Sequence, residues 1–280
     1  MSSRVKFEDS VNYKRRKSCI SVTRTIGKFN QKIIFYQELD KDGDVTIKTS
    51  KLKDLLASIS LPLKEVNLFS FVTNNEGMHD TAAIVPKPKA RCYLLLLGPI
   101  ELICLSDRVK IFNPSKKEDA TTVQLFVSEL QSTIETYSEN GPQNFEFLVL
   151  EVALDFLVTK FNHRLDLVQP ILDRLTSNNS PQESTVARLS ALKNGIESFK
   201  ATLEGLIQPI RELLQNDRNM ADLFLGPNRR NEKDHEEVEF LLEAASLEMN
   251  EISKYVFSFF VRTLSNFFHS KENTADDFSD

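Results

Sequence analysis

Two long segments between Phe145 and Leu225 carry apolar residues at every third or fourth position, and this pattern restricts the fold more than any other feature of the chain. Steps that average about 3.5 residues place apolar side chains along one narrow stripe of a helix, which must pack against another helix. The stripes comprise Leu150, Leu154, Leu157, Phe161, Leu165, Val168, Leu172 and Leu175, then Val186, Leu189, Ile196, Phe199, Leu203, Leu206, Ile210 and Leu213. The sequence therefore predicts long helices packed side by side.

A third long helix is predicted from about Asp234 to Leu264, because apolar residues again recur at helical spacing there. Proline removes an amide donor and crowds the preceding turn, so Pro170 and Pro209 are expected to bend their helices. Residues 144–270 are accordingly interpreted as an elongated bundle of long stalk helices. The polar residues 271–280 are interpreted as a disordered acidic tail.

The first half of the chain has a different pattern, with short apolar runs separated by turn residues. A β-hairpin is predicted around Asp40-Lys41-Asp42-Gly43-Asp44, and a short helix from Leu52 to Ile59. Further strands are expected at Val66–Val72, Ala82–Val85, Cys92–Leu97, Glu101–Leu105 and Val109–Phe112. An amphipathic helix follows from Val123 to Tyr137. Strands followed by a block of helices indicate an α+β fold, with a mostly antiparallel sheet covered by helices across residues 29–143.

Composition limits the kinds of partner. The chain has 280 residues, 35 Lys plus Arg against 40 Asp plus Glu, and a net charge of -5, so nucleic acid is not an expected partner. No run approaches the roughly 18 to 20 apolar residues that cross a bilayer as a helix. The cysteines Cys19, Cys92 and Cys104 lack zinc-site spacing, and we expect small buried side chains in a reducing compartment.

Residues 1–28 contain eight Lys or Arg with Ser and Thr between them. This composition is typical of a disordered basic tail, and more weakly of a mitochondrial presequence, against which Glu8 and Asp9 count. The sequence has no phosphate loop, no Gly-x-Gly-x-x-Gly, no Gly-x-Ser-x-Gly elbow and no zinc motif. An enzyme is therefore not expected.

Four stretches together resemble one family, the mitochondrial magnesium channels related to the bacterial CorA transporters. The run that ends in Asp107-Arg108-Val109-Lys110-Ile111-Phe112 is similar to the family's "DRVLLFD" strand. Asn144-Phe145-Glu146-Phe147 begins a run similar to "LPFEFRALEAAL". Asn216-Asp217-Arg218-Asn219-Met220-Ala221-Asp222 resembles part of "LLDDDEDMADMYL", and Glu236-Glu237-Val238-Glu239 resembles the start of "EEVEMLLE". The resemblance covers about residues 30–260.

The resemblance implies a domain on the matrix side of the mitochondrial inner membrane, a helical stalk, and self-association as a pentamer around an ion path. It also implies that Mg²⁺ binds acidic side chains between subunits. Mg²⁺ prefers carboxylate oxygen and keeps several waters, so weak sites can be built from few side chains. The candidate metal-binding residues are Asp173, Asp217 and Asp222.

The chain departs from the family pattern in two respects. It contains neither the two transmembrane helices nor the Gly-Met-Asn pore signature, and Asn216, Arg218 and Asn219 stand where the family usually has acidic residues. Two hypotheses remain. The chain is the magnesium-sensing domain of a channel, with transport only if a membrane half is present elsewhere. Alternatively, it is a non-transporting relative, soluble in the cytoplasm, that uses its helical seam to bind another protein.

Overall fold

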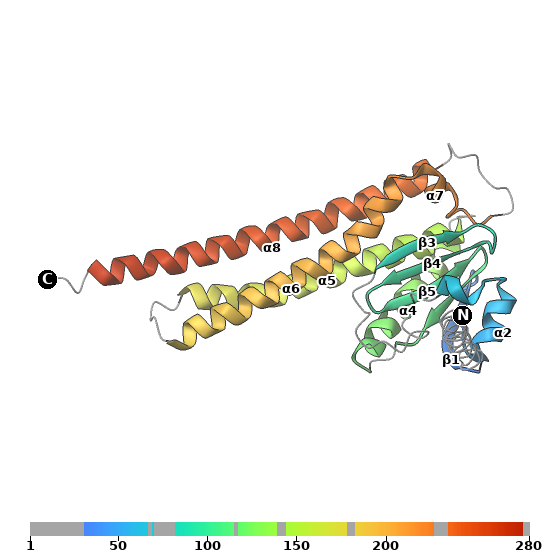
Figure 1. Cartoon of the computed structure of the whole chain (residues 1–280), viewed down its shortest axis with the longest axis horizontal. Helices are drawn as coiled ribbons and strands as arrows, with labels where there is room; N and C mark the ends of the chain where they lie inside the picture. The colour runs from blue at the N-terminus through green and yellow to red at the C-terminus, as the bar shows by residue number, and fades with distance from the viewer. Residues whose placement is uncertain are drawn as a thin grey trace, which may run out of the picture.

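The protein is an elongated molecule with a sheet at one end and long helices extending from it (Figure 1). The computed structural model describes residues 31–66, 69, 82–114, 117–138, 144–177, 183–226 and 235–276. The predicted basic tail, residues 1–28, and the cysteine Cys19 lie outside these residues. The expected α+β architecture is confirmed, with a sheet-bearing head followed by a stalk of long helices.

The head is built on a six-stranded antiparallel sheet in the order β2-β1-β6-β5-β4-β3. The strands are β1 (Ile33–Asp40), β2 (Val45–Lys51), β3 (Ala83–Lys87), β4 (Cys92–Leu97), β5 (Ile100–Leu105) and β6 (Arg108–Phe112). The predicted strand at Val66–Val72 is not matched at its first residue, because Val66 ends the short 3-10 helix η1 (Leu63–Val66). Of the rest of that segment, only Phe69 is described.

The predicted hairpin joins β1 to β2, and its acidic turn has a structural role. The Asp40 carboxylate accepts hydrogen bonds from the backbone N–H groups of Asp42 and Asp44 at 3.1 and 3.0 Å. Gly43 has a φ of 90°, a conformation that residues with a Cβ rarely adopt. These residues therefore fix the turn that sets the register of the first two strands.

Both faces of the central strands are buried, and the alternation of side chains divides them between two cores. On β4, Tyr93, Leu95 and Leu97 belong to the main core, which also contains the buried faces of α4 (Lys117–Ser138) and α5 (Phe145–Ser177). Cys92, Leu94 and Leu96 point to a smaller core beneath α2 (Leu52–Ser58). This arrangement explains why β4 reads as an uninterrupted apolar run.

Three helices form the stalk: α5, α6 (Glu183–Leu214) and α8 (Glu236–Asp276). They lie side by side in Figure 1, and α8 packs against both α5 and α6. Helix α5 continues through Pro170 and α6 through Pro209. Helix α8 ends twelve residues beyond the predicted end at Leu264, so the prediction of a disordered tail is wrong for residues 271–276.

One core joins the head to the stalk. Leu150, Leu154 and Leu157 of α5 are at most 2% exposed and belong to the same cluster as the sheet residues and as Leu203 and Leu206 of α6. The predicted boundary at residues 143 and 144 therefore separates secondary structures but not hydrophobic cores. It also follows that the described part of the α6 stripe, from Ile196 to Leu213, is covered by the chain's own helices, which corrects the expectation that this part of the seam binds another protein.

Cys92 and Cys104 are free and buried, as the sequence predicted. Burial raises the pKa of the Cys92 thiol to about 12 and that of Cys104 well above its usual value. In the described part of the chain, no helix has a stretch long and apolar enough to cross a bilayer.

Candidate functional site

The acidic run Asn216 to Asp222 folds into a short helix, α7 (Asp217–Ala221), at the head end of the stalk (Figure 1). Asn216 caps this helix, because its side-chain oxygen accepts a hydrogen bond from the Asn219 N–H at 3.0 Å. Met220 and Leu223 are fully buried in the main core. The run is therefore anchored by its apolar residues, and its first residues remain at the surface.

Glu146, in the first turn of α5, connects this run to the head. Its side chain is buried, and its Oε1 atom accepts hydrogen bonds from the backbone N–H groups of Leu225 at 2.8 Å and Gly226 at 3.2 Å. The Tyr93 hydroxyl donates to the backbone oxygen of Glu146 at 2.7 Å. A carboxylate at a helix N-terminus is favoured by the helix dipole, and here it also satisfies two backbone donors. Two of the sequence stretches that carry the family resemblance are thus joined directly.

The three predicted metal-binding aspartates lie in three different environments. The Asp217 side chain is 68% exposed at the start of α7, whereas Asp222, at the end of α7, is buried. Asp173 lies in the last part of α5, roughly 40 Å along the helix from Phe145. That part of α5 is at the opposite end of the stalk from α7 (Figure 1). A single copy of the chain therefore does not bring Asp173 to the other two.

His235 lies between α7 and α8, and its Nε2 atom is 3.3 Å from a carboxylate oxygen of Glu239 and 3.9 Å from one of Asp217. The residues after it, Glu236 and Glu237, form the acidic first turn of α8, as expected from the sequence. Among the residues that the structure describes, no group of three or more His, Cys, Asp or Glu side chains is arranged to hold a metal ion.

A second acidic region was not predicted. Glu151 of α5 faces Glu236 and Glu237 of α8 across a cleft of about 450 Å³. Burial, and then the charges of Asp155 and Glu237, raise the pKa of Glu151 above its usual value. Each of these glutamates belongs to a stretch that carries the family resemblance, but their meeting depends on how two helices distant in sequence pack. The cleft gives the head end of the stalk a local negative charge.

Comparison with known proteins agrees with this architecture. The sequence profile of the family described as "Magnesium transporter MRS2-like" matches residues 36–262, which span both the head and most of the stalk.

The chain belongs to the MRS2-like family.

Curated proteins of the MRS2 family match at low identity over much of the chain. Magnesium transporter MRS2-4 of Arabidopsis thaliana is 23% identical over 207 residues, which cover 68% of this chain and 47% of the relative. The mitochondrial inner membrane magnesium transporter mrs2 of Aspergillus fumigatus is 26% identical over 219 residues, which cover 74% of this chain and 35% of the relative. This MRS2-like chain therefore matches only about a third to a half of the length of these relatives.

A solved structure supports the fold. The cytoplasmic domain of ZntB from Vibrio parahaemolyticus matches 87% of this MRS2-like chain and 99% of its own, with a TM-score of 0.56 and 13% sequence identity. At this identity the match concerns the arrangement of the sheet and helices alone. The predicted resemblance to the magnesium transporters is confirmed at the level of the family by the MRS2-like match, and the predicted head-and-stalk arrangement by the shared fold.

Proposed function

We propose that this chain is the magnesium-responsive domain, outside the membrane, of a CorA-type magnesium transporter at the mitochondrial inner membrane. The observation that supports this function most strongly is the family match across residues 36–262, on a head-and-stalk fold shared with a solved cytoplasmic domain. Fungal relatives are named mitochondrial inner membrane magnesium transporters, which favours that membrane, and the proposal places this domain on its matrix side. Transport requires a membrane half.

In this proposal Mg²⁺ acts at weak sites between copies of the chain. Mg²⁺ keeps several of its waters and is bound through one or two carboxylates, so one exposed aspartate from each of two copies is a sufficient protein contribution. Asp217 is exposed and is assigned the direct contact. Asp222 is buried and is the C-cap residue of α7, where its backbone N–H donates to carbonyl oxygens of that helix. Asp173 is assigned to a separate contact at the far end of the stalk.

Self-association, as a pentamer in the proposal, is supported by the outer face of α8. Phe240, Leu247 and Val261 of this helix are 71%, 62% and 47% exposed, and they recur at multiples of seven residues. The opposite face of α8 is already buried against α5 and α6. The fourth position at this spacing is Lys254, whose side chain is 71% exposed, so one charge interrupts this apolar stripe. The proposal assigns the stripe to packing against a further helix.

The magnesium response can be tested by hydrogen exchange of the purified chain, with and without MgCl₂ at constant ionic strength. We expect Mg²⁺ to slow amide exchange in α7 and in the first turns of α8. The double variant Asp217→Asn/Asp222→Asn should lose this protection. Asp54→Asn, a matched change at an exposed position on α2, should keep it. Equal exchange with and without Mg²⁺ in the unmodified chain would rule out the proposed sensing.

The second hypothesis, a non-transporting relative that binds another protein, needs a different surface from the one first considered. Leu203 and Leu206 are internal, so charged residues there would disrupt the chain itself. The exposed stripe of α8 remains available for this role. Replacing Phe240 and Leu247 with serine should prevent co-purification of such a partner without unfolding the chain, and unchanged recovery would contradict this hypothesis.

A further inference from the structure

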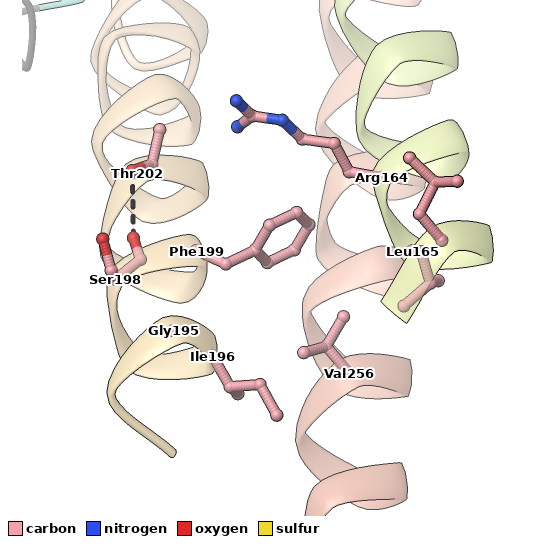
Figure 2. A pocket seen from close by; sticks show the side chains of 9 residues that line it. Arg164, Leu165, Gly195, Ile196, Ser198, Phe199, Thr202 and Val256 are labelled. Atoms are coloured by element: carbon pink, nitrogen blue, oxygen red, sulfur yellow. Dashed lines mark hydrogen bonds between the residues drawn. The ribbon is translucent and has the colours of Figure 1, made fainter. Parts of the chain in front are cut away.

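The stalk contains an open cavity between α5, α6 and α8, far from α7 and from the acidic cleft. Its volume is about 390 Å³, within the range of small-molecule sites in proteins. Leu165 of α5, Ile196 and Phe199 of α6, and Val256 of α8 supply apolar walls (Figure 2). The cavity therefore offers an apolar surface between three helices of the stalk.

Two features of α6 keep this space open. Gly195 lines the cavity without a side chain, and a Cβ atom added there would meet nothing within 4 Å. Phe199 is held by an edge-to-face contact with Phe161 of α5, with ring centroids 5.3 Å apart. Phe199 is therefore fixed against α5 and does not collapse into the space beside Gly195.

Arg164 supplies the charge at this cavity. Figure 2 shows its side chain extending from α5 into the gap toward α6, while the Phe199 ring points the opposite way from α6. No acidic side chain occurs among the described residues that line the cavity. Arg164 is therefore the one charged side chain among the described residues that line the cavity.

We propose that this stalk cavity binds an amphiphile with one carboxylate, of the medium-chain fatty acid class. The guanidinium of Arg164 pairs with the carboxylate, because its fork of N–H donors matches the two oxygens. The alkyl chain lies against Phe199, Ile196 and Val256. The inference does not depend on the magnesium proposal, because none of these residues belongs to α7 or to the acidic cleft.

Isothermal titration with decanoate below its micelle concentration tests the site, with decanol as the uncharged probe of the same length. We expect decanoate to bind with a stoichiometry of one per chain and decanol to bind at least tenfold more weakly, because a charge-assisted contact is lost. Octanoate, which is two methylenes shorter, should bind roughly sixteenfold more weakly than decanoate, since each buried methylene changes affinity roughly fourfold. Equal binding of decanol and decanoate, or no decanoate binding, would overturn the proposal.

Variants locate the binding within the cavity. Arg164→Gln should weaken decanoate binding at least tenfold, and Gly195→Leu should abolish it by filling the space while favouring the helix. Arg211→Gln is the matched control and should keep full affinity, because it removes an α6 arginine that contacts Asn250 elsewhere.

Circular dichroism verifies that each variant keeps its helices. If decanoate binds equally well to the parent, to Arg164→Gln and to Gly195→Leu, the binding is adventitious. That result would contradict the proposed binding site in the cavity. A different outcome would also overturn the proposal. If the parent chain does not bind decanoate, and the Gly195→Leu variant dissociates in sedimentation where the parent stays associated, the cavity is a contact between copies of the chain.

Discussion

The connection made by Glu146 gives a quantitative prediction for stability. In Glu146→Ala, the backbone N–H groups of Leu225 and Gly226 lose their acceptor in a buried or half-buried setting. An unsatisfied buried donor costs about 1 to 3 kcal/mol, and the lost favourable charge at the helix N-terminus adds a further 0.3 to about 1 kcal/mol. Because Gly226 is partly hydrated, we expect a total loss of about 3 kcal/mol in the free energy of unfolding.

Glu146→Gln separates the acceptor from the charge. The glutamine oxygen can still accept both hydrogen bonds, so this variant should lose only about 1 kcal/mol, the difference between charged and neutral acceptors. Glu197→Ala is the matched control, since the Glu197 side chain is 63% exposed and makes one surface pair with Lys193. That change should cost less than about 0.5 kcal/mol.

Urea unfolding followed by circular dichroism gives the three free energies, and hydrogen exchange shows where they act. In the alanine variant the amide of Leu225 should exchange faster than in the parent, whereas the glutamine variant should remain close to it. A stability of Glu146→Ala equal to that of Glu197→Ala would refute the reasoning. A glutamine variant as unstable as the alanine variant would show that charge, and not the acceptor, is what matters.

The other predictions concern cysteine reactivity, pH and the core. In a Cys19→Ser variant, a thiol reagent should not label the folded chain at neutral pH, because burial raises the pKa of Cys92 to about 12. Labelling in native buffer would contradict the buried position of this thiol. The pKa of Glu151 is raised in the folded state, so the folded chain holds this proton more tightly than the unfolded chain. The contribution of this group to the free energy of unfolding therefore grows as the pH falls from neutral toward 4.5, and it is lost as the pH rises. Glu151→Gln should therefore raise the melting temperature at pH 7 and have little effect near pH 4.5, and a lowered melting temperature at pH 7 would show a favourable partner instead. Leu203→Glu buries an unpaired charge and should cost at least about 3 kcal/mol in urea unfolding, so a cost below 1 kcal/mol would contradict its core position.

Periodicity predicted the stalk well, because the residues of a helix that are buried in a bundle are apolar and recur every three or four positions in the sequence. Leu150, Leu154 and Leu157 repeat at that spacing, and they are buried as expected. The end of α8 was misplaced because residues 269–276 are almost all polar, and polar residues do not distinguish a solvated helix from a tail. Val66 was misassigned to a strand because a short apolar run carries no period by which to reject one.

The candidate site was less predictable than the fold. The aspartates were chosen from their places in acidic runs, but their exposure depends on how α7 is anchored by Met220 and Leu223. The meeting of Glu151 with Glu237 depends on the packing of α5 against α8, which no local pattern encodes. The role of Glu146 was likewise hidden, because its partners are backbone groups of a turn about 80 residues away, as the separation to Gly226 shows.

Sedimentation velocity of the purified chain tests the central claim most directly. The measurement compares metal-free buffer with tens of millimolar MgCl₂, with NaCl added to match the ionic strength. A magnesium-responsive domain should change its association state with Mg²⁺, and the Asp217→Asn/Asp222→Asn variant should not. One unchanged monomer under both conditions, with identical behaviour of the variant, would contradict the assignment of this chain as a magnesium-sensing domain.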